Sequence, residues 1–89
     1  MKPDQLYQAL KDLADKLQIT VSEQNLKIAG VKVKSGLCKV KGKSIYVMDK
    51  HKSLHRKNVL LARCLNTMAL EDIYVVPAVR DFLTKTGSG

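Results

Sequence analysis

Aliphatic residues alternate with lysine through the middle of the chain, and this pattern constrains the fold most strongly. ITVSE begins at Ile19, LKIAGVKVKSG places valines between lysines, and LCKVKGKSIYVMD turns at its central glycine, Gly42. A period of two is typical of strands with one buried and one wet face. We therefore expect an antiparallel meander of three to four strands, with turns or bulges at Gly36 and Gly42.

The alternation also predicts which side chains are buried. Cys38 and Val40 continue through the turn to Ile45 and Val47, and this aliphatic set is expected to form the buried face. The lysines at 32, 34, 39 and 41 would then share the wet face. Like charges opposite each other destabilise a sheet, so stability alone does not favour such a row of ammonium groups.

Helical spacing flanks these strands on both sides. Residues 3–17 carry leucines one helical turn apart, with Pro3 and Asp4 in the first turn, where both are favourable. SLHRKNVLLARCLNTMAL, residues 53–70, predicts a second helix with Ser53 as its N-cap. Pro77 is suited to open a third helix.

A single α+β domain follows from this order of elements. The expected fold is a small antiparallel meander with helices on one face, in the order α-β-β-β-α-α, over residues 1–84, followed by a flexible tail at 85–89. A chain of 89 residues, 45% of them apolar, is long enough for one modest core.

Features at the N-terminus bear on localisation. The segment MKPDQLYQALKDLADKLQ is amphipathic and contains three aspartates, so it resembles neither a signal peptide nor a transit peptide. No apolar run approaches membrane-helix length. We expect a cytoplasmic protein with no membrane partner and with reduced thiols at Cys38 and Cys64.

The net charge of +8 is concentrated in one third of the chain. Residues 27–57 hold nine lysines and one arginine against a single aspartate, which gives +9. Such asymmetry predicts a nucleic acid or acidic protein partner, although a solvated face that keeps the chain soluble accounts for it equally well. The candidate anion-binding residues are Lys32, Lys34, Lys39, Lys41, Lys43, Lys52, Arg56 and Lys57.

The stretch DKHKSLHRK, residues 49–57, offers a metal site, an anion site or merely a charged helix start. His51 and His55 are four residues apart, but Ser53 lies between them as the cap, and Lys52 stands where a zinc peptidase needs glutamate. Structural zinc sites have four protein ligands, and this stretch does not supply them. We therefore expect two solvent-facing histidines, no metal and no cofactor. A capped helix start with added cations is a favourable place for phosphate.

Catalytic motifs are missing from the chain. GVKVKSG lacks phosphate-loop spacing, and neither paired carboxylates nor a Ser-His-Asp set is present. Lysines beside Cys38 could lower the pKa of a reactive thiol, but its alternation with Val40 favours a buried one, as helical spacing does for Cys64. We expect a protein that is not an enzyme.

The order of elements, with SIYVMD before VLLARCLNTM, resembles the ImmA/IrrE-like zinc-peptidase domain over about residues 5–70. That family carries HExxH on the corresponding helix. In LARCLNT the two zinc histidines would fall on Arg63 and Thr67 and the glutamate on Cys64. The resemblance therefore implies a metal-free remnant of the scaffold. SGLCKVKGKSIYVMDK is also similar to small bacterial proteins that offer no function to transfer.

Two functions remain in view. The first is a small non-enzymatic binding module whose basic face contacts a polyanionic partner, either nucleic acid or an acidic protein. The second is a protein-protein interaction or assembly subunit on a degenerate zincin-like scaffold, whose charge is incidental. Neither the partner nor the oligomeric state follows from the sequence.

Overall fold

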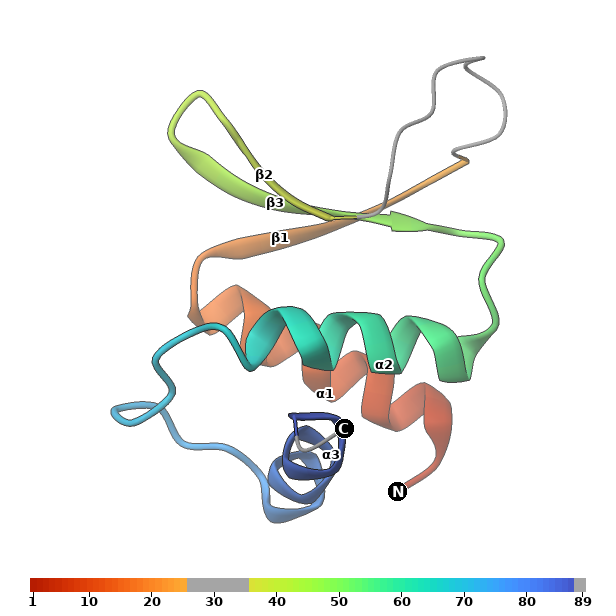
Figure 1. Ribbon diagram of the computed structural model, residues 1–89, viewed down its shortest axis with the longest axis vertical. Coiled ribbons are helices and arrows are strands. Elements are labelled where there is room, and N and C mark those ends of the chain that lie inside the picture. Colours follow the sequence, from red (N-terminus) through yellow and green to blue (C-terminus); the bar gives the residue numbers. More distant parts are fainter. Residues whose placement is uncertain (26–35, 88–89) are drawn as a thin grey trace.

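The computed structural model describes residues 1–25 and 36–87, which form three helices and three strands (Figure 1). The elements in chain order are α1 (Pro3–Lys16), β1 (Ile19–Gln24), β2 (Gly36–Val40), β3 (Lys43–Asp49), α2 (Leu54–Leu65) and α3 (Pro77–Gly87). The α+β class and the order α-β-β-β-α-α are confirmed. The strand expected through Val31 and Val33 lies outside the described residues.

The sheet is mixed, so the expected antiparallel meander is wrong. Its strand order is β1-β3-β2, with β1 parallel to β3 and β2 antiparallel to β3. Ile19 is in register with Ser44 in the parallel pair. Chain neighbours pair often enough to make a meander the default expectation, but here β3 lies between β1 and β2.

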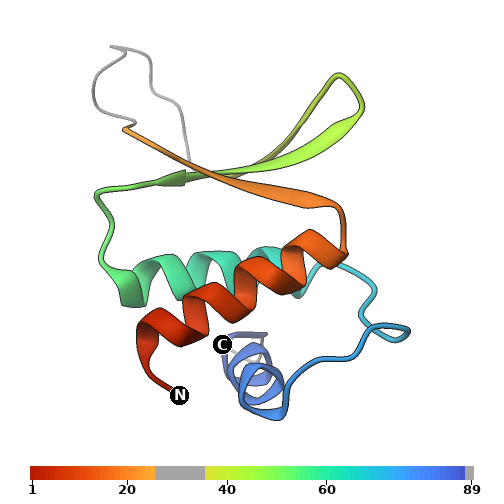
Figure 2. The same cartoon turned by 180° about the vertical axis from the view of Figure 1, so that it is seen from behind.

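Three layers build the molecule (Figures 1 and 2). The sheet forms one outer layer, α1 and α2 cover one of its faces, and α3 packs on the far side of those two helices. The prediction of helices on one face is confirmed. In the part of the chain that the structure describes, no helix has the length and apolar character needed to cross a membrane.

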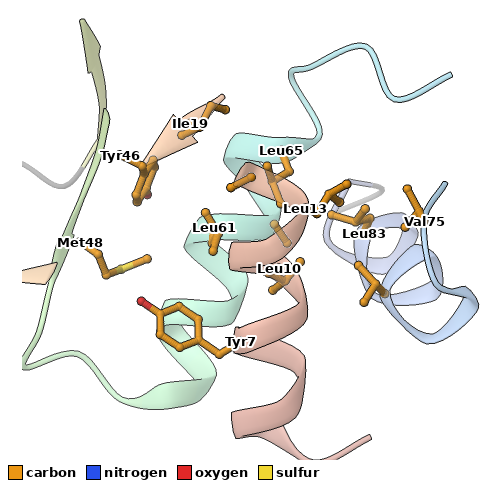
Figure 3. Packing of buried hydrophobic residues seen from close by; sticks show 13 residues of the cluster. Tyr7, Leu10, Leu13, Ile19, Tyr46, Met48, Leu61, Leu65, Val75 and Leu83 are labelled. Carbon is orange, nitrogen blue, oxygen red and sulfur yellow. The ribbon is translucent and has the colours of Figure 1, made fainter. Parts of the chain in front are cut away.

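The core occupies the space between the sheet and the helices and continues to α3 (Figure 3). Leu10, Met48, Leu61 and Leu65 are completely buried. Asn58 is the buried polar exception among the described residues, and its Nδ2 donates to the carbonyl oxygen of Pro3 at 3.1 Å. This bond ties α2 to the first turn of α1.

The predicted buried face of the β2–β3 hairpin is also wrong. On β3 the buried side chains are Tyr46 and Met48, whereas Ile45 and Val47 are on the other face and only partly buried. Cys38 pairs with Ile45 and therefore lies on that outer face, where it is exposed. A shift of one residue exchanges the faces of a strand, and alternation alone does not define which face is covered.

Several local signals for helix ends are confirmed. Ser53 caps α2 by accepting a hydrogen bond from the backbone N–H of Arg56 at 3.2 Å. Pro3 and Pro77 open α1 and α3. Helix α3 runs to Gly87, which is three residues beyond the expected domain boundary at 84.

Candidate nucleic-acid interface

A two-residue turn joins β2 to β3 and places three lysines close together. Val40 pairs with Lys43 across the turn, and both intervening residues have positive φ, 53° at Lys41 and 81° at Gly42. Positive φ at both central positions is the requirement of the type I′ turn, which suits the twist of a tight hairpin. Figures 1 and 2 show the tip of this hairpin curling away from the helical layer.

The hairpin lysines are exposed and carry unneutralised charge. Lys39 lies in β2, Lys41 in the turn and Lys43 at the start of β3, and all three side chains are exposed. None of them forms an ion pair with another described residue. Three ammonium groups within five residues therefore raise the local electrostatic potential at the tip.

The register assigns two of these lysines to opposite faces of the hairpin. Lys39 pairs with Ser44, which has the alternation phase of the buried Tyr46, so this lysine is on the helix-side face. Lys43 pairs with Val40 and shares the outer face with it and with Cys38. The expectation that lysines and aliphatic residues separate onto a wet and a buried face fails here.

The start of α2 forms a second basic group. Lys52 and Arg56 are exposed beside the capped helix end. Lys57 is different, because its ammonium forms an ion pair with the carboxylate of Glu23 on β1. Its Nζ also lies 5.7 Å from the centroid of the Tyr7 ring. The positive charge of Lys57 is thus largely neutralised within the fold.

The two basic groups lie at opposite ends of β3 (Figure 1). That strand has seven residues, which separates its ends by about 20 Å at ~3.3 Å per residue. The structure therefore brings Lys39, Lys41 and Lys43 together and leaves Lys52 and Arg56 apart from them. Lys32 and Lys34 are outside the described residues.

A tyrosine-centred cluster supports the start of α2 and was missed by the sequence interpretation. The Tyr7 ring is buried, with Nζ of Lys11 at 4.7 Å from its centroid. Burial, and next the nearby Glu23 carboxylate, raise the pKa of Tyr7 to about 12, so the phenol stays protonated. The spacing of Tyr7, Leu10 and Ala14 could have added Tyr7 to the core stripe. No local signal pairs Glu23 with Lys57, 34 residues away.

Both histidines are exposed. His51 precedes α2, in a turn where its backbone N–H donates to Oδ1 of Asp49 at 2.9 Å, and His55 lies within the helix. Within residues 1–25 and 36–87, no three His, Cys, Asp or Glu side chains gather closely enough to hold a metal ion. The absence of bound metal stays a prediction, which elemental analysis of the purified protein tests.

The positions aligned with the zinc-peptidase motif span the end of α2. Arg63 is exposed, and Cys64 is partly buried, which raises the pKa of its thiol. Thr67 lies beyond the end of α2, and its hydroxyl donates to the Cys64 carbonyl oxygen at 2.6 Å. No family model, curated protein or solved structure matches this chain.

The structure also has an apolar groove away from the hairpin lysines. It is formed by α1 and by the segment that leads into α3, with a volume of about 230 Å³. Tyr74 and Val76 border it and are 72% and 43% exposed. Ala9 and Leu13 contribute from α1, and Asp12 and Lys16 stand at its polar edge.

Proposed function

We propose that the protein is a non-enzymatic module that binds the phosphate backbone of nucleic acid through the β2–β3 hairpin. The observation that carries the proposal is the exposure of Lys39, Lys41 and Lys43 on a tip that curls away from the helices, with no ion pair to another described residue. Contact with phosphates releases counterions and is sequence-tolerant.

The hairpin is favoured over the start of α2 for two reasons. Its three unneutralised cations lie within five residues on a tip that curls away from the helices, whereas Lys50, Lys52 and Arg56 are spread over seven residues beside α2 and Lys57 is paired with Glu23. The helix start nevertheless offers the positive end of the α2 dipole to an anion, so the experiment must separate the two. Affinity from so few phosphate contacts should be weak, about 10⁻⁴–10⁻⁶ M.

Two double variants with equal loss of charge separate these surfaces. One is Lys39→Ala with Lys43→Ala, and the matched control is Lys52→Ala with Arg56→Ala. Binding of a fluorescent duplex is measured by anisotropy over a series of salt concentrations. The hairpin variant should lower the salt slope by about two units, since each phosphate contact contributes about 0.9. The control should leave it near the wild-type value.

Each alternative result has a distinct meaning. Absence of wild-type binding at low salt would rule out the proposed function. A slope reduced only in the Lys52 and Arg56 variant would move the contact to the helix start. Equal weakening in both would mean that net charge, and not the hairpin, governs binding.

The groove at Tyr74 supports the second candidate function, a protein-protein interaction or assembly subunit. Exposed tyrosine beside an apolar hollow is typical of interface residues that contribute strongly to binding. Size-exclusion chromatography with light scattering, run on wild type and on Tyr74→Ala, tests self-assembly through this groove. A monomer in both cases would count against it.

A further inference from the structure

The hairpin carries its cations on both faces, and this geometry bears on which nucleic acid it contacts. Lys39 is on the helix-side face of β2, and Lys43 is on the outer face of β3. Lys41 stands between them in the turn. A flat contact with one backbone would use a single face, so the ammonium groups on the other face would remain unused.

Single-stranded partners also require a feature that the hairpin lacks. Proteins hold single strands by stacking bases on aromatic side chains in a basic groove. Among the described residues, Tyr46 is the only aromatic in the hairpin, and it is buried toward the helices. Tyr74 is exposed, but it borders the groove against α1 and α3.

We infer, on the basis of the proposed function, that the partner is B-form duplex DNA and that the hairpin enters its major groove. That groove is about 12 Å wide and admits a two-stranded ribbon. Side chains project from the two faces of a ribbon, so Lys39 and Lys43 point in opposite directions when the hairpin enters the groove. Lys39 and Lys43 then reach phosphates on the two walls of the groove.

Duplex RNA is the informative comparison, because its major groove is deep and narrow and excludes side chains. At equal charge, it should bind more weakly than duplex DNA. Single-stranded DNA should also bind more weakly. Slopes of about 0.9 and 0.7 per contact give, for three contacts, roughly a fourfold preference for duplex at ~0.1 M salt.

A charge-conserving pair of variants tests the two-face geometry itself. Lys39→Ala with Cys38→Lys moves one ammonium to the outer face that already holds Lys43. Lys39→Ala with Leu37→Lys is the control, because Leu37 pairs with Tyr46 and lies on the same face as Lys39. Net charge is unchanged in both, and all three substituted side chains are exposed, so folding should be retained.

Binding to duplex DNA, single-stranded DNA and duplex RNA of one sequence is measured for wild type and both variants, with circular dichroism to verify folding. The Cys38 variant should lose the preference for duplex DNA over duplex RNA, and the Leu37 variant should keep it. If the Cys38 variant keeps it too, or wild type binds the three probes equally, groove entry is wrong while backbone binding stands. If wild type binds none of them, the proposed function itself fails.

Discussion

Replacing Gln18 by glycine is expected to stabilise the protein. Gln18 follows the C-cap of α1 and has a φ of 61°, so its backbone is in the left-handed region. Its N–H donates to the carbonyl oxygen of Asp15 at 2.9 Å, which closes the end of the helix. Glycine is the common residue at this position after a helix because it has no Cβ to clash.

The magnitude follows from two opposing terms. An L-residue in the left-handed region costs about 1–2 kcal/mol relative to its normal helical conformation. Glycine regains most of this but loses roughly 0.5–1 kcal/mol through its more flexible unfolded state. The net gain should be about 0.5–1 kcal/mol, which corresponds to a rise of about 3–6 °C in Tm for a domain of this size.

Thermal and urea unfolding, followed by circular dichroism, measure this gain. Gln18→Ala is the matched control, because it also shortens the exposed side chain but retains the Cβ. Glycine should exceed alanine in stability at unchanged m-value. If the glycine variant is equally or less stable than the alanine variant, backbone strain at Gln18 is not the cause.

Three further predictions address the thiols, the buried phenol and the core. Native Cys38 should react rapidly with a thiol reagent at neutral pH, whereas Cys64 should react slowly, because burial raises the pKa of its thiol; mass spectrometry after brief labelling distinguishes them. Since the pKa of Tyr7 is raised to about 12 in the fold, its stabilising contribution is complete below about pH 10 and is lost as pH rises through 12. The stability difference between wild type and Tyr7→Phe should therefore change over that interval in unfolding experiments. Leu61→Ala should cost about 3–5 kcal/mol by urea unfolding, since this side chain is completely buried, and the half-buried Leu60→Ala should cost less.

The helix starts were predictable because their signals are local, whereas α2 ends at Leu65, short of the expected residue 70. Leucine spacing, proline in a first turn and the Ser53 cap each depend on residues within one or two helical turns. The turn at Gly42 has the same local origin, since its positive φ favours glycine.

The sheet was predicted less well because its arrangement depends on distant contacts. Alternation showed a period of two, but the covered face is decided by where α1 and α2 pack, and that choice buried Tyr46 in place of Ile45. The parallel pairing of β1 with β3 joins residues 25 apart, such as Ile19 and Ser44, and nothing in either segment indicates it.

The candidate site was likewise predicted where the signal is local and missed where it depends on distant contacts. The sequence identified the lysines but not their separation into two groups, which the length of β3 imposes. It also grouped Lys57 of α2 with the free cations, although Glu23 of β1 neutralises it.

Strand β3 links two regions that evolution can alter with different consequences. Near Met48 it is held inside the core, so substitutions there decide whether the chain folds at all. Near Lys43 the strand is exposed, and its backbone curls away from the helical layer in Figures 1 and 2. Under the proposed function, substitutions at this end alter mainly the contact with nucleic acid. The affinity of that contact can therefore be redesigned with little effect on stability.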